Sequence, residues 1–84
     1  MPKVKICGNT RAEDLQLAAS LGADYLGLIF TESKRRVSPD TARTLLESLP
    51  DFKNFVAVFS NQPREEVEEI AHGLGIRILQ FHGE

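Results

Sequence analysis

A single cysteine is the first residue of this sequence whose type and position suggest a reactive group. Cys7 ends the β-branched run that begins at Val4, and the following Gly8 lets a backbone or a ligand approach closely. As a thiolate, Cys7 could act as a general base or as a nucleophile. As a thiol, it could equally be a small buried hydrophobic residue, because free cysteine is commonly buried. The residue type leaves both roles open.

The basic run Lys34-Arg35-Arg36 is a second candidate. It follows the apolar stretch 25–30, which has the length and composition of a strand. The planar guanidinium of an arginine in such a loop binds a carboxylate or a phosphate through two parallel hydrogen bonds. Three charges are too few for a nucleic-acid-binding patch. We therefore expect one arginine to bind an anionic group and the other cations to face solvent.

The two histidines indicate no metal site. His82 follows another apolar stretch and could act as an acid, a base or a hydrogen-bond donor, but a lone histidine is more often structural. His72 lies late in a predicted helix, where a cation is favourable. One cysteine and two separated histidines form no zinc-binding spacing, and the sequence contains neither a GxGxxG nor a P-loop pattern.

The elements that must position these residues alternate between two periodicities. Stretches with apolar residues at helical spacing predict three helices. Thr10 and Glu13 form a capping-box pattern at the start of the first helix, and Gly22 is suited to end it. Ser38-Pro39 predicts the start of the second helix, and Pro63 that of the third. Short apolar runs predict four strands, at residues 4–7, 25–30, 55–59 and 76–81.

The predicted order is therefore β-α-β-α-β-α-β, which is typical of an α/β fold with a parallel sheet. Both a flavodoxin-like open sheet and a (β/α)8 barrel use this alternation. Eight units of this length would need roughly 200 residues, the lower end for a barrel. The sequence holds three and a half units, and its last strand has no helix after it. We expect part of a larger arrangement.

Composition excludes several classes of protein. The 84 residues carry ten Lys and Arg against twelve Asp and Glu, a net charge of −2, and 42% are hydrophobic. Such values are ordinary for a globular domain and indicate neither a nucleic-acid nor a membrane partner. One cysteine cannot form an internal disulfide, which favours a reducing compartment. We expect a cytoplasmic protein with one partial domain, residues 1–84.

Three motifs together resemble the phosphoribosylanthranilate isomerase family of tryptophan biosynthesis. The likeness covers the whole chain in the right order, although position 9 is usually apolar in the family and position 81 is usually Leu. Neither change removes a group that does chemistry. The motifs are Lys5-Ile6-Cys7-Gly8-Asn9-Thr10, Ser33-Lys34-Arg35-Arg36-Val37-Ser38-Pro39 and Gln80-Phe81-His82-Gly83-Glu84.

The resemblance implies the N-terminal half of a (β/α)8 TIM barrel and an Amadori rearrangement of N-(5-phosphoribosyl)anthranilate, without cofactor or metal. It implies that Cys7 is the general base and that Arg35 lies close to the anthranilate carboxylate. Contacts to this small phosphoribosyl substrate are also expected from four further motif residues. The family's general acid and phosphate site have no counterpart in residues 1–84, so we expect the isolated chain to be nearly inactive. The four residues are Gly8, Asn9, Gln80 and His82.

Two other functions remain open at this point. The chain could be a non-catalytic half-barrel module that associates through its open edges, or another sugar-phosphate barrel enzyme, against which Cys7 and Arg35 speak. A half-barrel is expected to self-associate or to pair with a missing barrel half. Some of the apolar side chains that fill the interior of a complete barrel would then be exposed to solvent. The candidates are Ile6, Leu26, Leu28, Val56, Val58, Ile78 and Phe81.

Overall fold

Strands and helices alternate strictly in the structure, a computed structural model that describes residues 3–8 and 10–81. All pairings are parallel, and the strands lie in the order β1-β2-β3-β4. This confirms the predicted α/β architecture. The elements are β1 (Lys5–Ile6), α1 (Ala12–Ser20), β2 (Tyr25–Ile29), α2 (Pro39–Glu47), β3 (Phe55–Phe59), α3 (Arg64–Leu74) and β4 (Ile78–Phe81).

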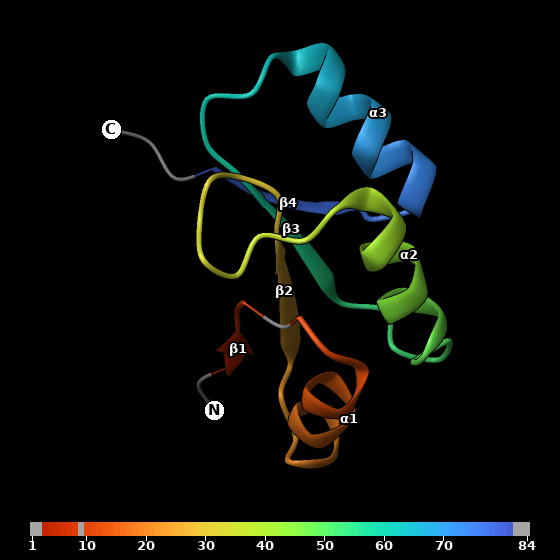
Figure 1. Ribbon diagram of the computed structural model, residues 1–84. Helices are drawn as coiled ribbons and strands as arrows, with labels where there is room; N and C mark the ends of the chain where they lie inside the picture. The colour runs from red at the N-terminus through yellow and green to blue at the C-terminus, as the bar shows by residue number, and fades with distance from the viewer. Residues whose placement is uncertain (1–2, 9, 82–84) are drawn as a thin grey trace.

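The unreversed strand order distinguishes a barrel segment from an open sheet. A flavodoxin-like sheet reverses its order at a switch point and carries helices on both faces. Here the order never reverses, and crossovers of the same hand place every helix on the same face. Figure 1 shows α1, α2 and α3 together on one side of the strands. The sheet therefore has the helix-covered outer face and the open inner face of a barrel wall.

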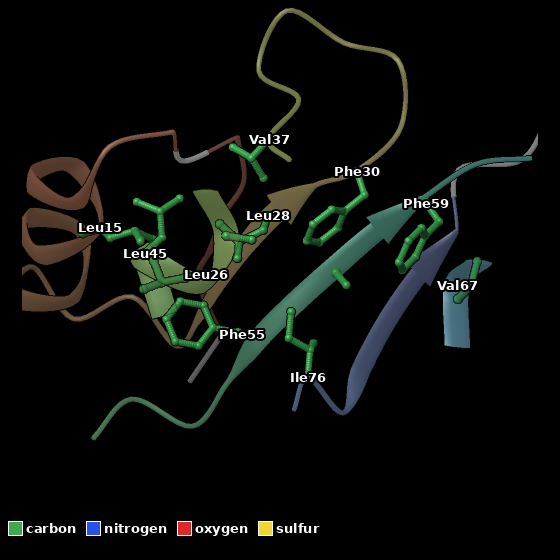
Figure 2. Close-up of a cluster of buried hydrophobic side chains, with 13 residues drawn as sticks. Leu15, Leu26, Leu28, Phe30, Val37, Leu45, Phe55, Phe59, Val67 and Ile76 are labelled. Carbon is green, nitrogen blue, oxygen red and sulfur yellow. The ribbon is translucent and has the colours of Figure 1, made fainter. Parts of the chain in front are cut away.

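The core lies between the sheet and its helices (Figure 2). Alternate residues of β2 and β3 point into it, since side chains along a strand alternate between faces. Leu15 of α1 and Leu45 of α2 meet these strand residues. Phe59 stacks on Phe30 with ring centroids 5.5 Å apart. The strand residues in this core are Leu26, Leu28, Phe55, Ala57 and Phe59.

A side-chain hydrogen bond across the inner face joins the two edge strands, β1 and β4. Lys5 of β1 and Gln80 of β4 both point away from the helices, because their neighbours Ile6 and Phe81 align with core residues. The Lys5 ammonium donates a hydrogen bond to the Gln80 side-chain carbonyl. Three strand spacings in a flat sheet are about 14 Å, so this contact requires a strongly curved sheet.

The expectation that many interior side chains face water is largely wrong. Leu26 and Leu28 lie on the helix side and are fully buried, because they belong to the alternate set that packs on Leu15 and Leu45. Val56 and Val58 do belong to the inner face, yet they are only 3% and 1% exposed. Ile6 and Phe81 align with helix-side residues, but Phe81 is 56% exposed, as expected, and Ile6 and the inner-face Ile78 are half-buried.

Helix starts agree with the sequence in one case and differ in another. The Ser38 hydroxyl accepts a hydrogen bond from the Thr41 amide and caps α2, as predicted. At α1 the capping-box prediction is wrong, because Arg11 occupies the N-cap position and its side chain makes no capping hydrogen bond. Glu13 is bound instead by the Arg11 guanidinium at 2.7 Å, and this hydrogen bond lowers the pKa of the Glu13 carboxyl.

Two helices are followed by glycines with left-handed backbone conformation, and the sequence predicted the first of them, Gly22. Gly22 and Gly75 both have positive φ, at 91° and 71°, and follow α1 and α3 directly or closely. The Arg43 guanidinium of α2 donates to the Gly73 carbonyl in the last turn of α3 at 3.1 Å. Among residues 3–8 and 10–81, no helix is both long and apolar enough to cross a membrane.

The two helix starts provide a matched pair of substitutions. Ser38→Ala should lower the free energy of unfolding by about 1 kcal/mol, because it removes the N-cap acceptor. Thr10→Ala should change it by less than about 0.5 kcal/mol, since Thr10 does not cap α1. Urea denaturation at one protein concentration measures both. Equal losses would show that the Ser38 cap contributes nothing specific.

Candidate functional site

Cys7 lies directly after β1, at the carboxyl end of the sheet where functional loops of this fold gather. Its thiol occupies the space over Gly27 of β2: a Cβ at Gly27 would lie only 2.7 Å from Cys7 Sγ. Gly27 alternates with Leu26 and Leu28, which face the helices, so Cys7 stands on the inner face. The side chain is half-buried and faces the barrel interior rather than the helix core.

Arg35 reaches the same place from a different loop. Gly8 has φ +78°, and a Cβ there would lie 2.6 Å from Arg35 Cδ and 3.3 Å from Arg35 Nη1. The arginine side chain therefore lies against the Gly8 backbone, next to Cys7. These three residues line one cleft of about 440 Å³, a volume within the usual range for small-ligand sites. From this end of the sheet the cleft runs along α1, since its lining also includes Asp14, Leu17 and Leu21.

The other cations of the basic run are arranged differently. Arg36 pairs with Glu32 of the same loop at 3.0 Å and forms a bridge to Ile29, whereas Lys34 is exposed. The Val37 amide donates to the Ile29 carbonyl at 2.9 Å and closes the loop at its base. Arg35 is thus the member of the run that lines the cleft with Cys7. The sequence predicted one such arginine, and the geometry favours this one.

A glutamine that sequence reasoning missed ties two loops of the site together. The Gln62 side-chain amide donates to the Phe30 carbonyl at 2.9 Å, and its carbonyl accepts from the Ser60 amide at 2.7 Å. Phe30 opens the loop that carries Arg35. Gln62 therefore joins the end of β3 to the end of β2. Only its place after an apolar strand could have indicated this role.

The remaining predicted site residues are more widely spread. Gln80 is on the inner face, where its side chain accepts from Lys5. Gly8 lies beneath Arg35, as described above. Asn9 and His82 fall outside the described residues. His72 is exposed on α3, away from the cleft. In the part of the chain that the structure describes, no cluster of His, Cys, Asp and Glu side chains could hold a metal ion.

Comparison with known proteins matches nearly the whole chain to one family. The sequence profile "PRAI: N-(5'phosphoribosyl)anthranilate (PRA) isomerase" matches residues 4–84. The N-(5'-phosphoribosyl)anthranilate isomerase of Caldanaerobacter subterraneus subsp. tengcongensis is 46% identical over 84 residues, which are all of this chain and 41% of that protein. The chain thus spans about two fifths of the length of such relatives.

Solved structures of relatives share the fold over the same portion. A phosphoribosyl anthranilate isomerase from Thermus thermophilus is 44% identical with a TM-score of 0.90, over 99% of this chain and 42% of that one. A second isomerase, solved in complex with reduced 1-(o-carboxyphenylamino)-1-deoxyribulose 5-phosphate, is 40% identical with a TM-score of 0.93. That alignment covers all of this chain and 44% of the other. The four strands are the N-terminal half of a TIM barrel.

Removal of the Gln62 side chain should loosen the loop that carries Arg35. Gln62→Ala leaves the Phe30 carbonyl without this partner, and a loss of about 1 kcal/mol should speed tryptic cleavage after residues 34–36 roughly fivefold. Asn61→Ala, a neighbouring exposed position, is the control and should leave the rate unchanged. Limited proteolysis followed by mass spectrometry measures the rates. Equal cleavage of both variants would show that Gln62 does not restrain the loop.

Proposed function

Because this chain belongs to the N-(5'-phosphoribosyl)anthranilate isomerase family, we propose that its residues supply the general base and the carboxylate-binding arginine of that family's Amadori rearrangement. The reaction converts N-(5-phosphoribosyl)anthranilate to 1-(2-carboxyphenylamino)-1-deoxyribulose 5-phosphate, a step of tryptophan biosynthesis. The observation that carries the proposal is the contact of the Arg35 side chain with the Gly8 backbone, directly next to Cys7 at the carboxyl end of β1. Neither residue is near the other in the sequence.

The proposed chemistry is an internal transfer of hydrogen. Opening of the furanose ring yields an iminium at C1, and the Cys7 thiolate then removes the proton from C2. The electron pair of that C–H bond forms the enolamine, which takes up a proton at C1 and loses the proton of its C2 hydroxyl to become the C2 ketone. Oxidation at C2 balances reduction at C1, so the isomerisation needs no external oxidant. Arg35 would hold the anthranilate carboxylate through its two N–H donors and orient C2 toward the thiolate.

The isolated chain is proposed to catalyse this reaction poorly. The resemblance assigns ring opening to an aspartate of a later strand and phosphate binding to later loops, and residues 1–84 contain no counterpart of either. A missing general acid alone costs about 10²–10⁴ in rate. The chain spans about two fifths of the length of its relatives, which is consistent with a site whose remaining residues lie in later strands and loops.

Association through the outer strands is a second proposed property. Among the described residues, the exposed large hydrophobic side chains fall into two groups at opposite edges of the sheet. One group borders β1: Leu17 of α1 and Leu21, just after that helix, line a cleft together with Ile6. The other group lies on β4. A second copy or a complementary barrel half would bury both groups. The groups are Val4, Leu17 and Leu21, and Leu79 and Phe81.

A completed barrel tests the proposed catalytic role of Cys7. Residues 1–84 would be followed by the part of the Thermus thermophilus isomerase that lies beyond its aligned segment. Cys7→Ser in this protein should cut kcat by about 10²–10⁴ and leave the circular dichroism spectrum unchanged, because serine is similar in size but a far weaker base. Turnover close to that of the unsubstituted barrel would refute the assignment.

The same completed barrel separates the two arginines. Arg35→Ala should raise KM for the phosphoribosyl substrate by the equivalent of about 1.5–3 kcal/mol, because a charged hydrogen bond to the carboxylate is lost. Arg36→Ala is the matched control and should have a smaller effect, since Arg36 pairs with Glu32. Steady-state kinetics measures both. A larger effect at Arg36 would mean that the wrong residue has been assigned.

Light scattering of the purified 84-residue chain tests the association. We expect the ordered form to have at least twice the 9.4 kDa mass of one chain, and a monomeric form to bind the dye ANS. Phe81→Lys should weaken the association, and Thr44→Lys, which adds the same charge on the exposed face of α2, should not. A monomer that unfolds cooperatively and binds no ANS would contradict the proposal.

A further inference from the structure

Gly27 is an unexpected residue in the middle of a buried strand. The other residues of β2 are large and apolar or aromatic, and Gly27 itself is buried. A glycine within a strand is destabilising by roughly 0.5–1 kcal/mol relative to alanine, and it often marks a place where another group approaches closely. The approaching group here is Cys7. A Cβ at Gly27 would lie 2.7 Å from Cys7 Sγ, 3.2 Å from its Cα and 3.3 Å from its Cβ.

We propose that Gly27 is a positioning residue whose missing side chain creates the space for the Cys7 thiol on the inner face. The register of β1 and β2 pairs Lys5 with Tyr25 and Ile6 with Leu26, so Cys7 stands directly beside Gly27. Cβ atoms of directly opposed strand residues normally lie about 4.5–5.5 Å apart. The corresponding separation here would be 3.3 Å. A side chain at residue 27 would therefore require the thiol to turn away and the end of β1 to shift by a few tenths of an ångström.

The consequence for the site goes beyond one thiol rotamer. Sγ could turn away from an added methyl group, but the Cα and Cβ of Cys7 are fixed to the backbone and could not. Any side chain at residue 27 would thus push the end of β1 away from β2. Gly8 follows Cys7, and Arg35 lies against the Gly8 backbone. Gly27 would in this way set the positions of both residues that the proposed function uses, and the inference rests on that function for its catalytic meaning.

Alkylation of Cys7 tests the geometry without any catalytic assay. In the 84-residue chain at a concentration at which it is ordered, Gly27→Ala should expose the displaced thiol and raise its rate of reaction with iodoacetamide by about tenfold. Gly73→Ala is the matched control, because no atom lies within 4 Å of a Cβ at Gly73. It should leave the rate unchanged within about twofold. An unchanged rate in Gly27→Ala, with an unchanged circular dichroism spectrum, would overturn the proposal.

A double substitution covers the case in which Gly27→Ala fails to fold. Cys7→Ala removes Sγ, which makes the only one of the three contacts shorter than 3.0 Å. The loss of urea resistance caused by Gly27→Ala should therefore be smaller in the Cys7→Ala background than in the parent chain. An equal loss in both backgrounds would show that the missing side chain of Gly27 does not make room for the Cys7 thiol, and would overturn the proposal. Neither measurement depends on turnover. If the Cys7→Ser barrel were active, the catalytic role of Cys7 would be refuted, but the alkylation and urea experiments would still test the positioning role of Gly27.

Discussion

Parallel pairing between consecutive strands is the constraint on which the rest of this structure depends. Parallel neighbours cannot be joined by a tight turn, so each connection must pass through a helix on its way back. Since the crossovers share one hand, the three helices lie on one face and leave the other to curve inward. All carboxyl ends then meet at one rim. Cys7 and Arg35 come from two different strand-to-helix connections and meet for this reason, and Gln62 from a third connection binds the start of the loop that carries Arg35.

Much of the fold could be predicted from local patterns. Short apolar runs located every strand, and the Ser38-Pro39 pair located the start of α2, because both signals act within a few residues. The start of α1 could not be predicted in the same way. Its capping-box pattern was present, but Arg11 lies close enough to bind Glu13 and removes that carboxylate from the capping role. A local motif predicts poorly where another local partner competes for the same group.

The residue types of the candidate site could be proposed from the sequence, but the contacts between them could not. Cys7 and Arg35 could be selected from their positions after apolar strands, and the resemblance separated Arg35 from its neighbours in the run. The tight contacts that hold them, against Gly27 and Gly8, depend on the distance between β1 and β2, which no sequence pattern specifies. The same holds for the buried state of Val56 and Val58. It also holds for the bridge between Lys5 and Gln80, which come from the first and last strands.

The loop that carries Arg35 also has an entropic property. Its far end is closed by the hydrogen bond from the Val37 amide to the Ile29 carbonyl, and its near end by Gln62 on the Phe30 carbonyl. A segment tied at both ends samples few conformations. Binding normally loses roughly 0.5–1.5 kcal/mol for each rotamer-rich side chain that it immobilises. Arg35 already rests on the Gly8 backbone, so part of that ordering occurs when the chain folds, before an anionic ligand arrives.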